Sequence, residues 1–212
     1  MPKDRKKSNL AAARTRMYHD LVFECAERTF GETGFAESSM QDLAAEAGIS
    51  LKTLYATFPG KDDIYKEILA VRGLGLLEAI RLVQSAEGTP TERLAIGVRG
   101  IVSYLVEHPD FFHILLQEGH GWGLAPRGEE ARVNWQAGIS TVRDLLADGM
   151  KTGEFLPGDP GLLAPTVNAV LQAQLAGLLE RNAELNVDAI SDEILRTMMR
   201  LLCGASGPTP SD

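Results

Sequence analysis

The fold is decided near the N-terminus by residues 39–58, which read SMQDLAAEAGISLKTLYATF. This stretch predicts two short helices, because Ser39 and Ser50 are good N-caps and apolar residues follow each of them at helical spacing. Gly48 stands between the helices and accepts the left-handed backbone that a side chain resists. We expect Ile49 to pack the corner of the turn. Two short helices joined by a glycine-containing turn of about three or four residues are typical of a helix-turn-helix.

The second of these helices has an apolar side and a polar side. The apolar residues, which we expect to anchor the helix inward, are Leu51, Leu54 and Phe58. The polar residues, which are then free to face the major groove of DNA, are Lys52, Thr53, Tyr55 and Thr57. The pattern alone also fits an ordinary helical hairpin in an all-α protein.

Helical periodicity extends in both directions from this stretch. A first helix is expected from about Ala13 to Glu32, where Gly34 follows as a left-handed C-terminal residue. After Pro59-Gly60, further helices are expected near residues 61–84, 91–107, 110–118, 128–152, 160–182 and 187–202. We find no internal repeat and no strand pattern. The sequence therefore predicts an all-α fold, with an N-terminal three-helix helix-turn-helix domain and a C-terminal helical bundle.

Charge is distributed unevenly along the chain. The net charge is −8, which argues against nonspecific coating of nucleic acid. Residues 1–16, however, carry six basic residues and one acid, and a basic arm on an acidic body suggests a nucleic-acid contact at one end. A solvated tail is the alternative. The expected segments are a flexible basic arm (1–12), the helix-turn-helix domain (13–60), a larger helical domain (61–203) and a disordered tail (204–212).

Composition excludes several classes of protein. Of the 212 residues, 44% are hydrophobic and 24% are charged, as in an ordinary soluble globular protein. No apolar run approaches the roughly 18 residues of a membrane span, and the N-terminus lacks the apolar segment of a secretory signal. The two cysteines, Cys25 and Cys203, have no metal or redox spacing. We therefore expect a cytoplasmic protein with no membrane partner.

The helix-turn-helix segment resembles that of the TetR family of transcriptional regulators. The residues that resemble its recognition segment and the start of its fourth helix are Ala47, Gly48, Ile49, Ser50, Thr53, Leu54, Tyr55, Phe58, Pro59, Lys61 and Asp62. Those that resemble the end of its first helix are Ala26, Phe30, Gly34 and Phe35. The resemblance covers roughly residues 14–70 and is weak beyond them. It implies a homodimeric regulator, usually a repressor, that a small-molecule effector bound in the C-terminal domain releases from a palindromic DNA operator.

The resemblance also implies roles for individual residues in binding DNA. Gln41 would reach a base edge or phosphate, and Lys61 would bind phosphate through its ammonium. The residues expected to touch bases or phosphates from the recognition helix are Lys52, Thr53, Tyr55 and Thr57, although the family often carries His at the last position. Ser39 and Ser50 can cap their helices and still bind phosphate, and capping alone also explains both. The charge distribution, separately from the resemblance, suggests that the basic arm supplies much of the attraction to phosphate, with Arg14 and Arg16, at the base of the first helix, nearest the DNA backbone.

The C-terminal domain is expected to dimerise through its last two helices. Small residues at helical spacing let two helices approach closely, and two-fold symmetry lets two recognition helices read half-sites about one helical turn apart. The candidate interface residues are Ala169, Ala173, Ala176, Gly177, Ile194 and Met198. An internal packing face is the alternative.

The effector site that the resemblance implies is expected in an apolar space between helices. The candidate lining residues are Phe111, Phe112, Leu115, Leu116, Trp122, Trp135 and Met150, and residues of this kind are also typical of a core. His108, His113 and His120 are metal-capable, but their spacing does not place three ligands on one helical face, so we expect no metal site.

No sequence motif of an enzyme is found. The chain has no phosphate-cradling glycine loop, nucleophile elbow or paired-carboxylate motif, and we expect neither catalysis nor a cofactor. Two alternatives to a ligand-controlled regulator remain, namely a structural DNA-binding protein without an effector and a helical enzyme or carrier.

Overall fold

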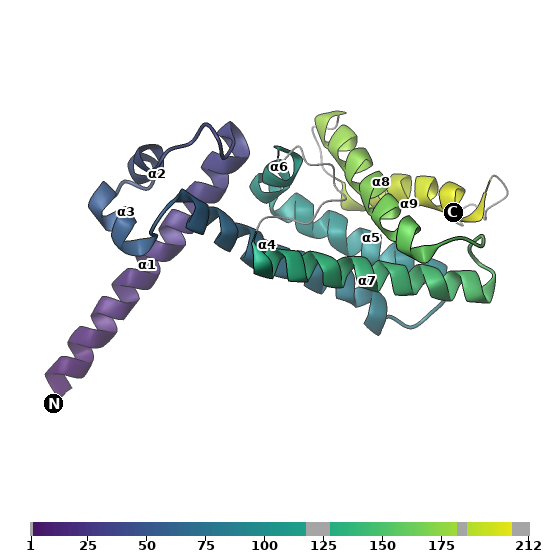
Figure 1. Cartoon of the computed structure of the whole chain (residues 1–212), viewed down its shortest axis with the longest axis horizontal. Coiled ribbons are helices and arrows are strands. Elements are labelled where there is room, and N and C mark those ends of the chain that lie inside the picture. Colours follow the sequence, from purple (N-terminus) through teal and green to yellow (C-terminus); the bar gives the residue numbers. More distant parts are fainter. Residues whose placement is uncertain (1, 118–127, 182–185, 205–212) are drawn as a thin grey trace. The chain divides into compact units, whose positions relative to one another are not determined.

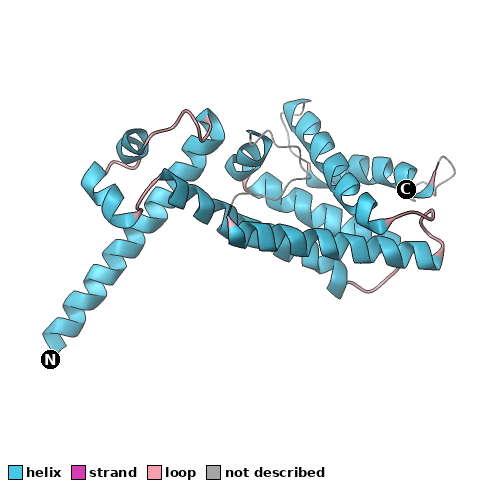
Figure 2. Ribbon diagram, in the orientation of Figure 1, coloured by secondary structure: helices cyan, strands magenta, loops and turns pink. Residues whose placement is uncertain are grey.

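The computed structural model describes residues 2–117, 128–181 and 186–204, and these residues form helices and no strand (Figures 1 and 2). The helices are α1 (Pro2–Thr33), α2 (Met40–Glu46), α3 (Leu51–Thr57), α4 (Lys61–Ser85), α5 (Pro90–Glu107), α6 (Pro109–Gln117), α7 (Glu129–Thr152), α8 (Pro160–Arg181) and α9 (Val187–Cys203). This confirms the predicted all-α fold. None of the described helices is long and apolar enough to cross a membrane.

The first helix differs from its prediction at its start. It begins at Pro2 instead of near Ala13, so most of the segment expected as a flexible arm is helical. Residues 3–13, KDRKKSNLAAA, contain neither glycine nor an internal proline and are rich in good helix formers. Proline is also well suited to the first position of a helix. Charge suggested an arm there, but helix propensity decides the local structure.

The chain forms two compact units, and the boundary between them lies within α4. The first unit includes the residues up to Leu69 together with Pro109–Gln117, and the second includes the rest of the chain. The expected boundary lay between Gly60 and Lys61. The first two turns of α4 and the whole of α6 are thus parts of the N-terminal unit.

The core of the first unit is built from the apolar sides of α1, α3 and α4. Phe30, Leu54, Ile64 and Ile68 have no exposed surface. The α6 helix packs on the end of α1 at Gly31, where an added Cβ would lie 2.8 Å from the carbonyl oxygen of Asp110. Glycine at this position therefore allows the two helices to touch through their backbones.

The second unit packs α7 against α8 and α5 against α9. The side chains buried at these contacts include Val102, Leu145, Leu146, Leu175, Ile194 and Met198. Ile194 and Met198 are four residues apart, which places both on the same face of α9.

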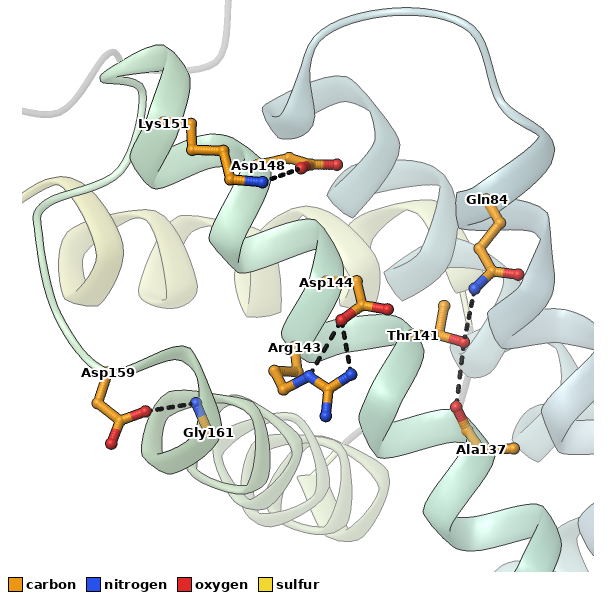
Figure 3. A network of polar contacts seen from close by, with 9 residues as sticks. All are labelled: Gln84, Ala137, Thr141, Arg143, Asp144, Asp148, Lys151, Asp159 and Gly161. Carbon is orange, nitrogen blue, oxygen red and sulfur yellow. Dashed lines mark hydrogen bonds and ion pairs between the residues drawn. The ribbon is translucent and has the colours of Figure 1, made fainter.

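Hydrogen bonds and ion pairs also connect residues of the second unit (Figure 3). Gln84 of α4 donates to the Thr141 hydroxyl of α7 at 3.2 Å, and that hydroxyl donates to the carbonyl of Ala137 at 3.1 Å. The backbone N–H of Gly161 donates to the Asp159 carboxylate at 2.8 Å, which satisfies one of the open donors at the start of α8. Surface ion pairs on α7 join Arg143 to Asp144 and Lys151 to Asp148.

Candidate nucleic-acid interface

The turn between α2 and α3 has the geometry that its sequence predicts. Gly48 has a φ of +63°, a left-handed conformation that glycine adopts without strain. The N–H of Ile49 donates back to the carbonyl of Ala44 at 3.0 Å, which fixes the corner. Ala44 and Ala47 are buried where the helices cross.

Both serines at the starts of the short helices act as caps. The Ser39 hydroxyl accepts the N–H of Asp42 at 3.2 Å, and the Asp42 carboxylate accepts the N–H of Ser39 at 2.9 Å, a complete capping box. The Ser50 hydroxyl accepts the N–H of Thr53 at 3.1 Å. These bonds fix where α2 and α3 begin, and a phosphate contact by either serine remains a prediction.

The α3 helix presents a polar surface. Leu54 and Phe58 are 0% and 3% exposed, whereas Tyr55 is 51% exposed and Lys52 is also exposed. Helical geometry explains the contrast, because neighbouring residues are turned by about 100° from one another. The side chains of Lys52 and Tyr55 are thus available to a partner on the outer side of α3.

The two threonines of α3 are less available than the sequence suggests. Thr53 and Thr57 are half-buried. The Thr57 hydroxyl donates to the carbonyl of Thr53 at 3.0 Å, and the Thr53 hydroxyl lies 2.8 Å from that of Ser50. Each hydroxyl can still accept a hydrogen bond, but the hydrogen of Thr57 is directed to its own helix.

A histidine that the sequence does not single out supports the end of α3. The His19 ring of α1 stacks on Phe58, with ring centroids 4.9 Å apart. Its Nε2 lies 2.7 Å from a carboxylate oxygen of Glu67 in α4. This side chain therefore connects α1, the C-cap of α3 and the second turn of α4. The contacts join residues 39 and 48 positions apart, and no local pattern could indicate them.

Exposed cations lie on α1 as well as on α3. Arg14 and Arg16 are exposed near the start of the described side chains, as expected for a contact with a DNA backbone. Arg28 is paired with Glu46 of α2, and its hydrogen bond with that carboxylate raises the pKa of the guanidinium, which stays charged. Burial raises the pKa of the nearby Cys25 thiol, so this side chain acts as a neutral core residue.

Gln41 and Lys61 differ in their availability. Gln41 is exposed in the first turn of α2, where it can reach a partner. The Lys61 ammonium is instead directed into the protein, where it donates to the carbonyl oxygens of Phe35 and Ser38, both at 2.6 Å. The expectation that Lys61 presents its ammonium to phosphate does not fit this arrangement, because backbone acceptors occupy the donors.

The residues expected to line an effector site are divided between the two units. Phe111 and Phe112 are 2% and 1% exposed and belong to the core of the first unit. Leu115 and Leu116 are half-buried on the same helix, whereas Trp135 and Met150 are half-buried in the second unit. Trp122 lies outside the described residues. The apolar pattern of α6 thus reflects packing on α1, which accounts for Phe111 and Phe112.

The structure describes two of the three metal-capable histidines, His108 and His113. His108 caps the end of α5 with its ring 4.5 Å from that of Tyr104, and His113 is exposed on α6. His120 lies outside the described residues. Across the described part of the chain, no group of three His, Cys, Asp or Glu side chains could hold a metal ion.

The candidate dimer residues separate into two groups. Ile194 and Met198 have no exposed surface within one protomer, so their assignment to an interface was wrong and they are core residues. Ala173 is exposed, and Ala169, Ala176 and Gly177 are half-exposed along one side of α8. A Cβ added to Gly177 would meet no atom within 4 Å. The small residues of α8 therefore keep a surface open that α9 does not cover.

Comparison with known proteins identifies the N-terminal helices. Residues 22–68 match the family model of the bacterial regulatory proteins, tetR family. The chain is 24% identical to the HTH-type transcriptional repressor SCO4008 of Streptomyces coelicolor, over 85% of this chain and 93% of that repressor.

Solved structures have the same fold. The chain is 28% identical to the TetR family transcriptional regulator PfmR of Thermus thermophilus, with a TM-score of 0.67 and coverage of 82% of this chain and 94% of PfmR. It also shares the fold of the transcriptional regulator FadR of Bacillus subtilis, solved in complex with stearoyl-CoA, at 18% identity, a TM-score of 0.67 and coverage of 87% and 97%. These similarities confirm the resemblance seen in the helix-turn-helix residues, and they are to regulators, not enzymes. Residues 22–68 therefore form a helix-turn-helix domain of the tetR-family type, and the chain as a whole is similar to transcriptional regulators of the TetR family.

Proposed function

We propose that the protein is a one-component repressor whose dimer binds a palindromic operator and leaves it when a small molecule binds the C-terminal bundle. The observation that supports this most directly is the surface of α3, where Lys52 and Tyr55 are exposed above the buried Leu54 and Phe58. A short helix that is anchored by its buried apolar side can enter a major groove with its polar side chains toward the bases.

Charge and hydrogen-bonding capacity suggest which exposed side chains would contact bases and which would contact the DNA backbone. Lys52, in the first turn of α3, can donate to base acceptors or to phosphate, and the Tyr55 hydroxyl can bond to phosphate. Gln41 on α2 is placed to bond a base edge or the DNA backbone. Arg14 and Arg16 add positive charge on α1, beside the helices that read the sequence.

Dimerisation would place two copies of α3, one from each protomer, on one operator. The open side of α8, which carries Ala169, Ala173 and Gly177, suits a second copy of the same helix because small side chains permit close approach. A two-fold dimer then requires a palindromic site with its half-sites about one helical turn apart.

Control by an effector needs a path from the bundle to the DNA-binding helices. The α6 helix lies in the sequence between α5 and α7 of the second unit, but it packs on α1 in the first. Gln117 at its end donates to the carbonyl of Gly31 at 2.5 Å. A ligand that binds the DNA-incompetent state more tightly can therefore act through α6 as well as α4.

The test is a mobility shift of the purified full-length protein on DNA from upstream of its own gene. Stearoyl-CoA is a reasonable first effector probe, since FadR of Bacillus subtilis was solved with it. We expect sequence-dependent binding at modest salt and release of the DNA by a bound small molecule. Binding without sequence dependence would contradict the proposal. Specific binding that no acyl-CoA reverses, with no small molecule in the purified protein by mass spectrometry, would instead favour a DNA-binding protein without an effector.

A further inference from the structure

The Lys61 ammonium is bound to the turn between α1 and α2. Its Nζ donates to the carbonyl oxygens of Phe35 and Ser38 at 2.6 Å each and lies 3.5 Å from that of Ala36. It also lies 4.4 Å from the centroid of the Phe35 ring, within range of a cation–π contact. An ammonium has three N–H donors, and three carbonyls of one turn surround this one.

The ring of Phe35 also contacts Tyr65, which lies on the same face of α4 as Lys61. Tyr65, one helical turn after Lys61, has its ring centroid 4.5 Å from that of Phe35. Phe30 of α1 contacts the other side of the cluster, at 5.5 Å from Phe35 and 5.6 Å from Tyr65. Side chains four apart on a helix face the same way, so Lys61 and Tyr65 together fasten the turn to α4.

The turn in question sets the start of α2. Ser38 contributes one of the carbonyls bound by Lys61 and directly precedes Ser39, the N-cap of α2. The Ser38 hydroxyl closes the turn from within by donating to the carbonyl of Gly34 at 2.6 Å. Gln41 is exposed two residues beyond the cap. The direction in which α2 leaves the turn, and with it the position of Gln41, depends on these bonds.

We propose that Lys61 is a positioning residue for DNA binding, which holds the turn of residues 34–38 and the start of α2 in place and makes no phosphate contact of its own. The proposal rests on the proposed function, because the effect on DNA passes through α2. Hydrogen bonds from a charged donor are among the strongest in proteins. Loss of the ammonium should therefore loosen the turn in the free protein, before any DNA is present.

The test compares Lys61→Met with Lys66→Met in the full-length protein. Lys66 is exposed on the same helix, so its substitution removes the same charge without disturbing the turn. Amide exchange is measured without DNA at Asp42 and Leu43, whose N–H groups donate to the side chain and carbonyl of Ser39. We expect exchange about tenfold faster in Lys61→Met, and operator affinity about tenfold lower. The slope of log affinity against log salt should equal that of the wild type.

The two explanations for Lys61 give opposite results. A phosphate contact would leave exchange unchanged in the free protein and would lower the salt slope by about one; a lowered slope overturns the proposal, whatever the exchange rates. Failure of Lys61→Met alone to fold without DNA supports it, because a phosphate ligand is not needed in the free state. If the wild type binds no DNA, the proposed function fails, and with it the role of Lys61 in DNA binding, but exchange still shows whether Lys61 holds the turn.

Discussion

Leu54 and Tyr55 are neighbours in α3, but Leu54 is completely buried and Tyr55 is 51% exposed. The burial of one side chain fixes the direction of the other, because both are attached to the same rigid turn of helix. The stability of the unit and the proposed DNA recognition therefore depend on adjacent residues, and substitutions can separate the two effects.

Leu54→Ala should destabilise the N-terminal unit. The substitution leaves a cavity where α3 packs on α1 and should lower the free energy of unfolding by about 3 kcal/mol. Denaturant unfolding followed by circular dichroism measures the loss. Ala56→Ser, at an exposed position of the same helix, serves as the control and should unfold like the wild type. Equal stability of the Leu54→Ala protein would show that α3 is not anchored by this side chain.

Lys52→Ala should weaken operator binding with little effect on folding. Lys52 is exposed in the first turn of α3, so its removal leaves no cavity but takes away a cation from the reading surface. We expect operator affinity to fall by about 1–3 kcal/mol, measured by fluorescence anisotropy on operator and on scrambled DNA. If the wild-type and Lys52→Ala proteins bound the operator equally well, α3 could not be the reading helix.

The parts of this site that the sequence predicts are those set by local rules. Ser39, Gly48 and Ser50 define the helix ends through bonds within three residues, and these caps and the turn are found as predicted. The contacts of Lys61 and His19 could not be predicted from the sequence. The partners that tie these two side chains to other helices and turns lie between 23 and 48 residues away, and no local pattern distinguishes a lysine that binds backbone carbonyls from one that binds phosphate.

Apolar periodicity has a similar limit in the C-terminal helices. It shows which side of a helix is buried, but it does not identify the partner. Ile194 and Met198 have the spacing of an interface and lie in the core of the protomer, and Phe111 and Phe112 have the character of a pocket and pack in the first unit. Only the exposure of each side chain separates these cases.

Deletion of residues 1–12 should lower operator affinity and flatten its dependence on salt. The deleted segment contains Lys3, Arg5, Lys6 and Lys7, and each phosphate contact that is lost lowers the salt slope by about 0.9. Affinities measured between about 50 and 200 mM salt test this. A full-length protein with these four residues changed to glutamine keeps the segment and should behave like the deletion. Salt slopes equal to that of the wild type would show that the segment does not contact DNA.

Glu154→Gln should destabilise the second unit, and the effect should depend on pH. The Glu154 carboxylate accepts the N–H and hydroxyl of Thr91 at 3.0 and 2.7 Å. Burial opposes the charge of this carboxylate, but hydrogen bonds from Thr91, Thr152 and Thr89 outweigh it and lower the pKa of Glu154. A carboxyl with a lower pKa in the folded state stabilises the protein above its unfolded pKa, and this contribution is lost as the pH falls through the folded pKa.

We therefore expect Glu154→Gln to lower the Tm by a few degrees, about 2–4 °C, at pH 7. The difference from the wild type should shrink as the pH is lowered below about 4. Glu87→Gln, at an exposed loop position, provides the control and should match the wild type throughout. A Tm difference that stays constant from neutral to acidic pH would mean that the charge of Glu154 does not contribute to stability.

Ala173→Glu should separate the dimer into monomers and abolish operator binding without unfolding the protomer. Ala173 is exposed on the open side of α8, so a single protomer can accommodate the glutamate, but a two-fold interface would bring two carboxylates together among apolar side chains. Burying such unpaired charges is costly. Light scattering should give the mass of one chain, near 23.0 kDa, with an unchanged circular dichroism spectrum. Gln136→Glu, at an exposed position of α7, adds the same charge elsewhere and should leave the dimer intact. A dimeric Ala173→Glu protein that still binds its operator would place the interface on another surface.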